Sequence, residues 1–93
     1  MGLTQTRPEK SAAREHAAYA MRNTLSREAR EGGLNHAEAI NSAAHVFTSI
    51  LVGAYKTNKD REAVIQALPD LVRAYIPQWE KIYADFQHKS ASQ

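Results

Sequence analysis

The stretch 35–56 constrains the fold most, because its apolar residues cover more than one side of a helix. One broad face recurs at the helical period and combines large side chains with alanines: Ile40, Ala43, Ala44, Phe47, Ile50, Leu51, Ala54 and Tyr55. A strip nearly opposite carries small residues: Ala39, Ser42, Val46, Ser49 and Gly53. Since polar residues keep only a narrow strip, this helix needs neighbours on two sides.

Local signals mark where this central helix begins and ends. Asn35 can cap its N-terminus, and Glu38 stands three residues later, as in a capping box. Leu34 precedes the cap and is placed for a hydrophobic staple. A polar connection follows at 57–60, so we predict a helix at about 36–57.

A first helix is expected at about 7–31. Thr6 and Glu9 have the spacing of a capping box. Gly32 and Gly33 can end the helix cheaply, because glycine adopts a left-handed conformation without a steric cost.

The apolar stripe of the first helix is thin: Ala17, Ala18, Met21, Leu25 and Ala29. Charged residues share the same side, so only the middle of the helix can be deeply buried. A break or bend near Thr24 is an alternative to one continuous helix, because Asn23, Thr24 and Ser26 are poor interior residues. We expect neighbouring helices or a second subunit to hold this segment in place.

The third segment, at about 61–87, carries large apolar residues spaced by threes and fours throughout: Val64, Ile65, Leu68, Leu71, Val72, Tyr75, Ile76, Trp79, Ile82, Tyr83 and Phe86. Pro69 and Pro77 interrupt it, and two interior prolines cost roughly 6 kcal/mol. Burying one large apolar side chain contributes roughly 1.5–3 kcal/mol, so the stripe can offset that cost. The stripe keeps its register across both prolines. We therefore favour one bent helix, with a break near Pro69 as the alternative, and expect it to pair with the broad face of the central helix.

These segments predict an all-α fold of three main helices in one domain, 1–93, with flexible ends at 1–6 and 89–93. A chain of this length builds only a marginal core, so we expect dimerisation to complete the helical bundle. The chain shows no secretory signal and no apolar run of about 20 residues, which predicts a cytoplasmic protein without a membrane span.

The residue types argue against catalysis and metal binding. The chain has no cysteine, and its four histidines show no ligand spacing such as HxxxH. Glu38, Asn41 and His45 share one polar strip and could in principle do acid–base chemistry, but a solvated helix face explains them better. We expect no enzyme activity, no catalytic residues, no cofactor and no metal site.

Nucleic-acid binding is the alternative function. The net charge is only +2, but the first segment is rich in arginine, and its guanidinium groups suit phosphate. The candidate contacts are Arg14, Arg22, Arg27 and Arg30. Plotted on a helix they scatter, with glutamates between them, so we favour a salt-bridged, solvated helix over a DNA- or RNA-binding surface.

Protein–protein interaction is the function that the sequence favours. The small-residue strip defined above is the preferred interface, because it would let another backbone come close. Tyr75, Trp79 and Tyr83 are of the types that anchor interfaces, although packing in the core is the favoured explanation for them. The sequence therefore predicts a small regulatory or adaptor protein that forms a homodimer and binds a larger protein partner.

Overall fold

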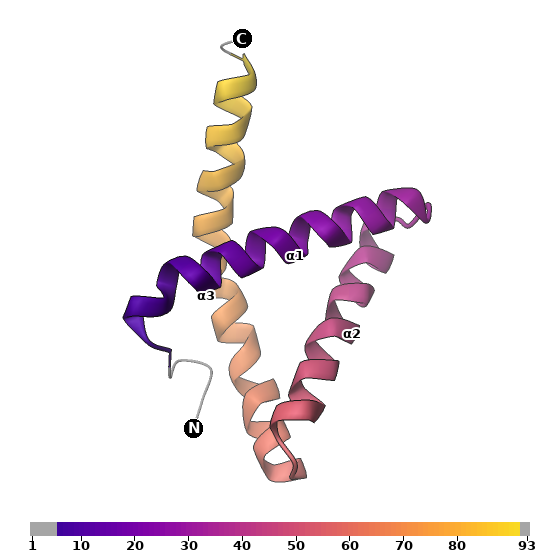
Figure 1. The fold of residues 1–93 in the computed structure, drawn as a ribbon, viewed down its shortest axis with the longest axis vertical. Helices are drawn as coiled ribbons and strands as arrows, with labels where there is room; N and C mark the ends of the chain where they lie inside the picture. Colours follow the sequence, from indigo (N-terminus) through magenta and orange to yellow (C-terminus); the bar gives the residue numbers. More distant parts are fainter. Residues whose placement is uncertain (1–5, 92–93) are drawn as a thin grey trace.

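The computed structural model describes the backbone of residues 6–91 and the side chains of residues 6–87. A short 3-10 turn, η1 (Pro8–Lys10), leads into three helices: α1 (Ser11–Glu31), α2 (His36–Ala54) and α3 (Asn58–Ala91). The described residues contain no strand. The predicted all-α fold with three main helices is confirmed (Figure 1).

The chain enters α1 differently from the prediction. The residue before η1 is Arg7, which makes no side-chain cap, so the capping box predicted at Thr6 and Glu9 is wrong. A proline opens the 3-10 turn instead, where its missing N–H has no partner to lose. Beyond this turn α1 is continuous, so the alternative of a break near Thr24 is wrong as well.

The connection between α1 and α2 forms as the glycines and the cap predict. Gly33 has a left-handed φ of 69°, and the Leu34 N–H donates to the Ala29 carbonyl over 2.8 Å, which closes a Schellman motif. Asn35 Oδ1 then accepts from the Glu38 N–H, while Glu38 Oε1 accepts from the Asn35 N–H. Both bonds of the predicted capping box are therefore present.

The corner between α2 and α3 contains an arginine that the sequence did not single out. α2 ends at Ala54, three residues before the predicted boundary, and Thr57 Oγ1 accepts from the Asp60 N–H to cap α3. Arg61 Nε donates to the Tyr55 carbonyl over 2.7 Å, and Arg61 Nη2 reaches the Val52 carbonyl at 3.4 Å. A positive side chain thus closes the C-terminal end of α2, where carbonyls lack partners within the helix.

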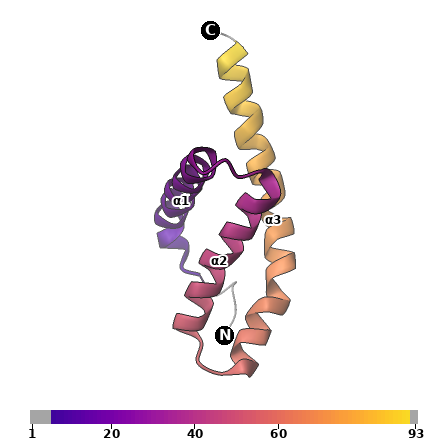
Figure 2. The ribbon, with the colours of Figure 1, turned by 90° about the vertical axis from the view of Figure 1, so that its right-hand side faces the viewer.

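α3 is one helix of 34 residues with Pro69 and Pro77 inside it, which confirms the single bent helix. Figure 2 shows that it changes direction about half-way along, in the region of the prolines. It runs to Ala91, beyond the predicted end at 87. Of the predicted flexible ends, 1–5 and 92–93 lie outside the described residues.

The three helices lie along the sides of an open triangle rather than around a common core (Figure 1). α1 crosses α3, and the C-terminal half of α3 continues past the crossing. Among the described residues the buried apolar ones are Ala29, Leu51 and Val64. The radius of gyration is 15.5 Å, against about 12 Å for a compact chain of this length.

Candidate interaction surfaces

Aromatic side chains hold α1 and α3 together where they cross. Tyr19 of α1 packs edge-on against Trp79 of α3, with ring centroids 5.3 Å apart. Tyr83 lies beside Trp79 at 6.0 Å. Of the three predicted interface aromatics, Trp79 and Tyr83 thus serve the fold, whereas Tyr75 lines the edge of this crossing and stays exposed.

Arg22 completes this cluster. Its Nη2 and Nε donate to the Tyr83 hydroxyl at 2.7 and 3.1 Å, and its guanidinium lies 5.2 Å from the centre of the Tyr83 ring. Sequence reasoning placed Arg22 among possible anion contacts and did not use Tyr19. The one available signal was that Tyr19 is the only aromatic residue of the first segment.

A groove of about 330 Å³ runs beside the crossing. Its walls mix charged, aromatic and apolar side chains: Ser11, Arg14, Glu15, Ala18, Tyr19, Tyr75, Gln78, Trp79 and Ile82. Arg14 Nη1 is already engaged, because it donates to the Arg7 carbonyl over 2.7 Å. The groove is open to solvent rather than enclosed.

The structure does not bring the four candidate arginines together. α1 spreads them along about 24 Å of helix, and Arg14 and Arg22 bind groups of their own chain. Arg27 Nη2 lies 3.7 Å from Glu28 Oε1 in an exposed ion pair. Arg30 lines a hollow at the corner of α1 and α2. The sequence predicts a salt-bridged first helix. Among the described residues of α1, the structure shows one ion pair, between Arg27 and Glu28.

The small-residue strip of α2 is covered only near its start. Ala39 lines the same hollow as Arg30, and Ser42, also half-buried, donates its hydroxyl to the Glu38 carbonyl. Further along, Val46, Ser49 and Gly53 are exposed. A Cβ added to Gly53 would meet nothing within 4 Å.

The broad face of α2 is also covered at one end only. Phe47, Leu51 and Tyr55 are shielded near the corner with α3, as the sequence predicts. Ile40 and Ile50, on the same face, are 71% and 58% exposed. The helices diverge from that corner (Figure 1), so the broad face of α2 is shielded only near α3 and is open along the rest of its length.

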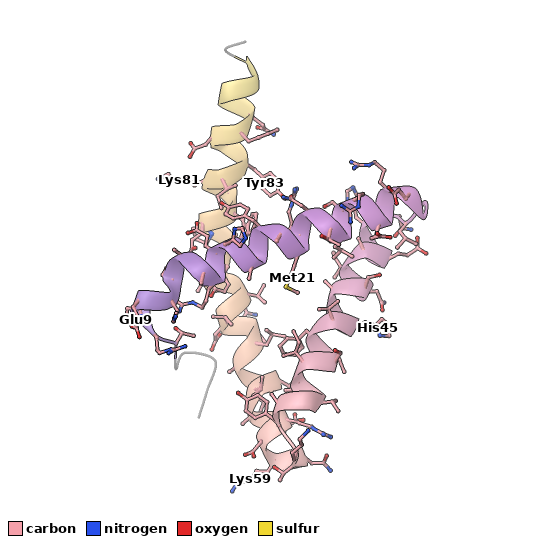
Figure 3. All side chains as sticks on the ribbon, in the orientation of Figure 1. Glu9, Met21, His45, Lys59, Lys81 and Tyr83 are labelled. Atoms are coloured by element: carbon pink, nitrogen blue, oxygen red, sulfur yellow. The ribbon has the colours of Figure 1, made fainter. Side chains whose placement is uncertain are left out.

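Polar groups of the described region form no cluster suited to metal binding. Residues 6–87 hold no group of three histidine or carboxylate side chains that could bind a metal ion. Glu38 is used in the capping box, and His45 points away from the other helices (Figure 3). None of the described helices is both long and apolar enough to cross a membrane.

Comparison with known proteins adds no assignment: no family model, no curated protein and no solved structure matches this chain.

Proposed function

We propose that this chain is a small non-enzymatic regulatory or adaptor protein of the cytoplasm that acts by binding other protein chains and works as a homodimer. The observation that carries the proposal is the amount of apolar surface that the three helices leave uncovered. Among residues 6–87, twelve large apolar side chains are at least 39% exposed, against three buried apolar residues. Exposed apolar surface of this extent marks sites of association in soluble proteins.

The total surface area supports the same proposal. The chain has 7789 Å² of accessible surface, whereas a compact monomer of this mass has about 5,400 Å². The excess, about 2,400 Å² per chain, lies within the range of about 1,000–2,500 Å² that each partner contributes to an obligate interface.

Sedimentation at micromolar concentration tests the homodimer. We expect about twice the 10.4 kDa chain mass. If the exposed end of the small-residue strip takes part, Ser49→Leu and Gly53→Leu weaken association while helix content stays unchanged. A monomer at all accessible concentrations would contradict the homodimer.

Binding to heparin or duplex DNA tests the nucleic-acid alternative. We expect no retention at physiological salt, either for the native chain or after Arg14, Arg22, Arg27 and Arg30 are changed to Gln. Salt-dependent retention that the four substitutions abolish would replace the adaptor proposal by nucleic-acid binding. A pull-down from the native cell then identifies the larger partner.

A further inference from the structure

The groove beside the crossing of α1 and α3 has aromatic walls. Tyr19 comes from α1, whereas Tyr75 and Trp79 lie four residues apart and so share one side of α3. The rings of Tyr19 and Trp79 meet at an interplanar angle of 60°, so they enclose a corner rather than a flat stack. Aromatic faces carry the negative part of the ring quadrupole and therefore attract a cation.

A carboxylate lies at the same groove. Glu15 stands four residues before Tyr19, on the same side of α1, and its side chain is exposed. Among residues 6–87, no arginine or lysine forms an ion pair with Glu15. A negative charge beside aromatic faces favours a positively charged ligand over a neutral or negative one.

The aromatic cluster at this crossing holds one arginine of the chain itself. The guanidinium of Arg22 lies 5.2 Å from the centre of the Tyr83 ring and donates to the Tyr83 hydroxyl. Tyr83 lies beside Trp79, but no arginine or lysine from residues 6–87 lies over the rings that line the groove. These rings can therefore give an incoming side chain the contact that Tyr83 gives to Arg22.

We propose that this groove receives an arginine side chain of the protein partner. The inference rests on the proposed function and names the group that is recognised. A guanidinium group fits both kinds of wall, because its flat face stacks on aromatic rings while the N–H groups along its edge donate to a carboxylate. A lysine ammonium is more strongly hydrated and gains less in a groove that is open to solvent. The volume, about 330 Å³, lies at the low end of the range for ligand sites.

Arg14 is the group at the groove that opposes a cation. Its Nη1 donates to the Arg7 carbonyl over 2.7 Å, which holds the guanidinium toward the entry of η1 rather than over the rings. Its positive charge still lies at the wall of the groove. Arg14→Gln should therefore strengthen the binding of a cation and weaken the binding of an anion.

Titration of the full chain with short peptides, followed by NMR, tests the proposal. Trp79 is the only tryptophan, so its indole N–H gives a single signal from the groove. We expect an N-acetylated, C-amidated Gly-Arg-Gly peptide to shift this signal with a Kd of roughly 1–10 mM, because an open site leaves each contact partly hydrated. The citrulline peptide has the same shape without the charge. It and the lysine peptide should bind about threefold more weakly, or weaker still.

Substitutions at the groove assign the contacts. Tyr75→Leu removes a ring face and raises the Kd of the arginine peptide about two- to fivefold, whereas Tyr75→Phe keeps the ring and leaves the Kd unchanged. Glu15→Gln raises the Kd by a similar factor at low salt. Glu31→Gln is the matched control and leaves the Kd unchanged, because Glu31 lies about 24 Å further along α1, beyond the screening distance. Circular dichroism checks that helix content is the same in every variant.

The outcomes separate this inference from the proposed function. Equal binding of the arginine and citrulline peptides, or weaker binding of the arginine peptide to Arg14→Gln, overturns the cation site. Free arginine that binds more tightly than the peptide overturns a protein as its source. A captured partner whose binding is the same after Glu15→Gln and Tyr75→Leu overturns the groove but leaves the adaptor proposal standing. A chain that binds the arginine peptide but captures no protein contradicts the proposed function and its partner, and not the guanidinium site.

Discussion

At the scale of single residues, the corners of the triangle depend on a few backbone and arginine contacts. Gly33 adopts the left-handed conformation that ends α1, and Arg61 closes the end of α2. Arg22 binds the Tyr83 hydroxyl where α1 crosses α3. Because few of the described side chains are buried, the relative positions of the three helices depend strongly on these contacts.

Two glycine substitutions are expected to act in opposite directions. Gly33→Ala lowers the free energy of unfolding by about 1–2 kcal/mol, because a Cβ is strained at positive φ. Gly53→Ala raises it by about 0.5–1 kcal/mol, because alanine favours the helix interior and its Cβ meets nothing within 4 Å. Urea unfolding followed by circular dichroism measures both. A loss of stability in Gly53→Ala would instead indicate that another chain packs closely against Gly53.

The contact between Arg22 and Tyr83 can be measured by a double-mutant cycle of Arg22→Gln and Tyr83→Phe. We expect a coupling free energy of about 0.5–1.5 kcal/mol, because the pair combines a charge-assisted hydrogen bond with a cation–π contact but stays exposed to water. The neighbouring pair Arg73 and Asp70, exposed and three residues apart on one helix, is the control and couples by less than about 0.5 kcal/mol. Equal coupling in both cycles would mean that the Arg22 contact does not hold the crossing.

At the scale of elements, each helix is defined locally but only partly covered. α2 exposes Ile40 at one end and buries Leu51 at the other. α3 continues through Pro69 and Pro77 and bends near them (Figure 2). By helical phase, Pro77 lies on the side of α3 opposite its apolar stripe, so the proline takes no part in the apolar contacts of the helix.

Replacement of Pro77 by alanine is expected to raise the free energy of unfolding, by up to about 3 kcal/mol. The substitution restores a backbone hydrogen bond and removes a clash with the preceding turn. Urea unfolding at fixed protein concentration measures it, with the exposed Ala74→Ser as a control that changes stability by less than about 0.5 kcal/mol. A drop in stability would show that the bend itself is needed for the contacts of α3.

At the scale of the whole molecule, the helices meet in pairs and enclose no common core. The dimensions are 51 × 34 × 20 Å, with α3 as the longest element. With three buried apolar residues in the described part of the chain, the fold has little margin against the conformational entropy gained on unfolding. Association is the direct way to add buried area without changing the helices.

Thermal unfolding is therefore expected to depend on protein concentration. For a dimer that unfolds as it dissociates, a tenfold increase in concentration raises Tm by roughly 3–6 °C for a chain of this size. Scans by circular dichroism over a hundredfold range of protein concentration measure the shift. A Tm that stays constant in the native chain would mean that the open monomer is stable by itself.

Local signals in the sequence predict where each helix begins and ends. The capping box at Asn35, the stop at Gly33 and the continuous stripe through Pro69 and Pro77 are local signals, because the hydrogen bonds that they describe join residues within a few positions. Such signals say which residues share a face of a helix. They do not say at what angle two faces meet.

Which of those faces are covered depends on how the helices pack in three dimensions. The same apolar spacing that predicts a packed core leaves Ile40 and Val72 exposed, because the helices diverge from their corners. The crossing of α1 and α3 rests on Tyr19 and Arg22, which lie about 60 residues from their partners. Contacts across such a distance depend on the path of the whole chain, and no periodicity within one helix records it.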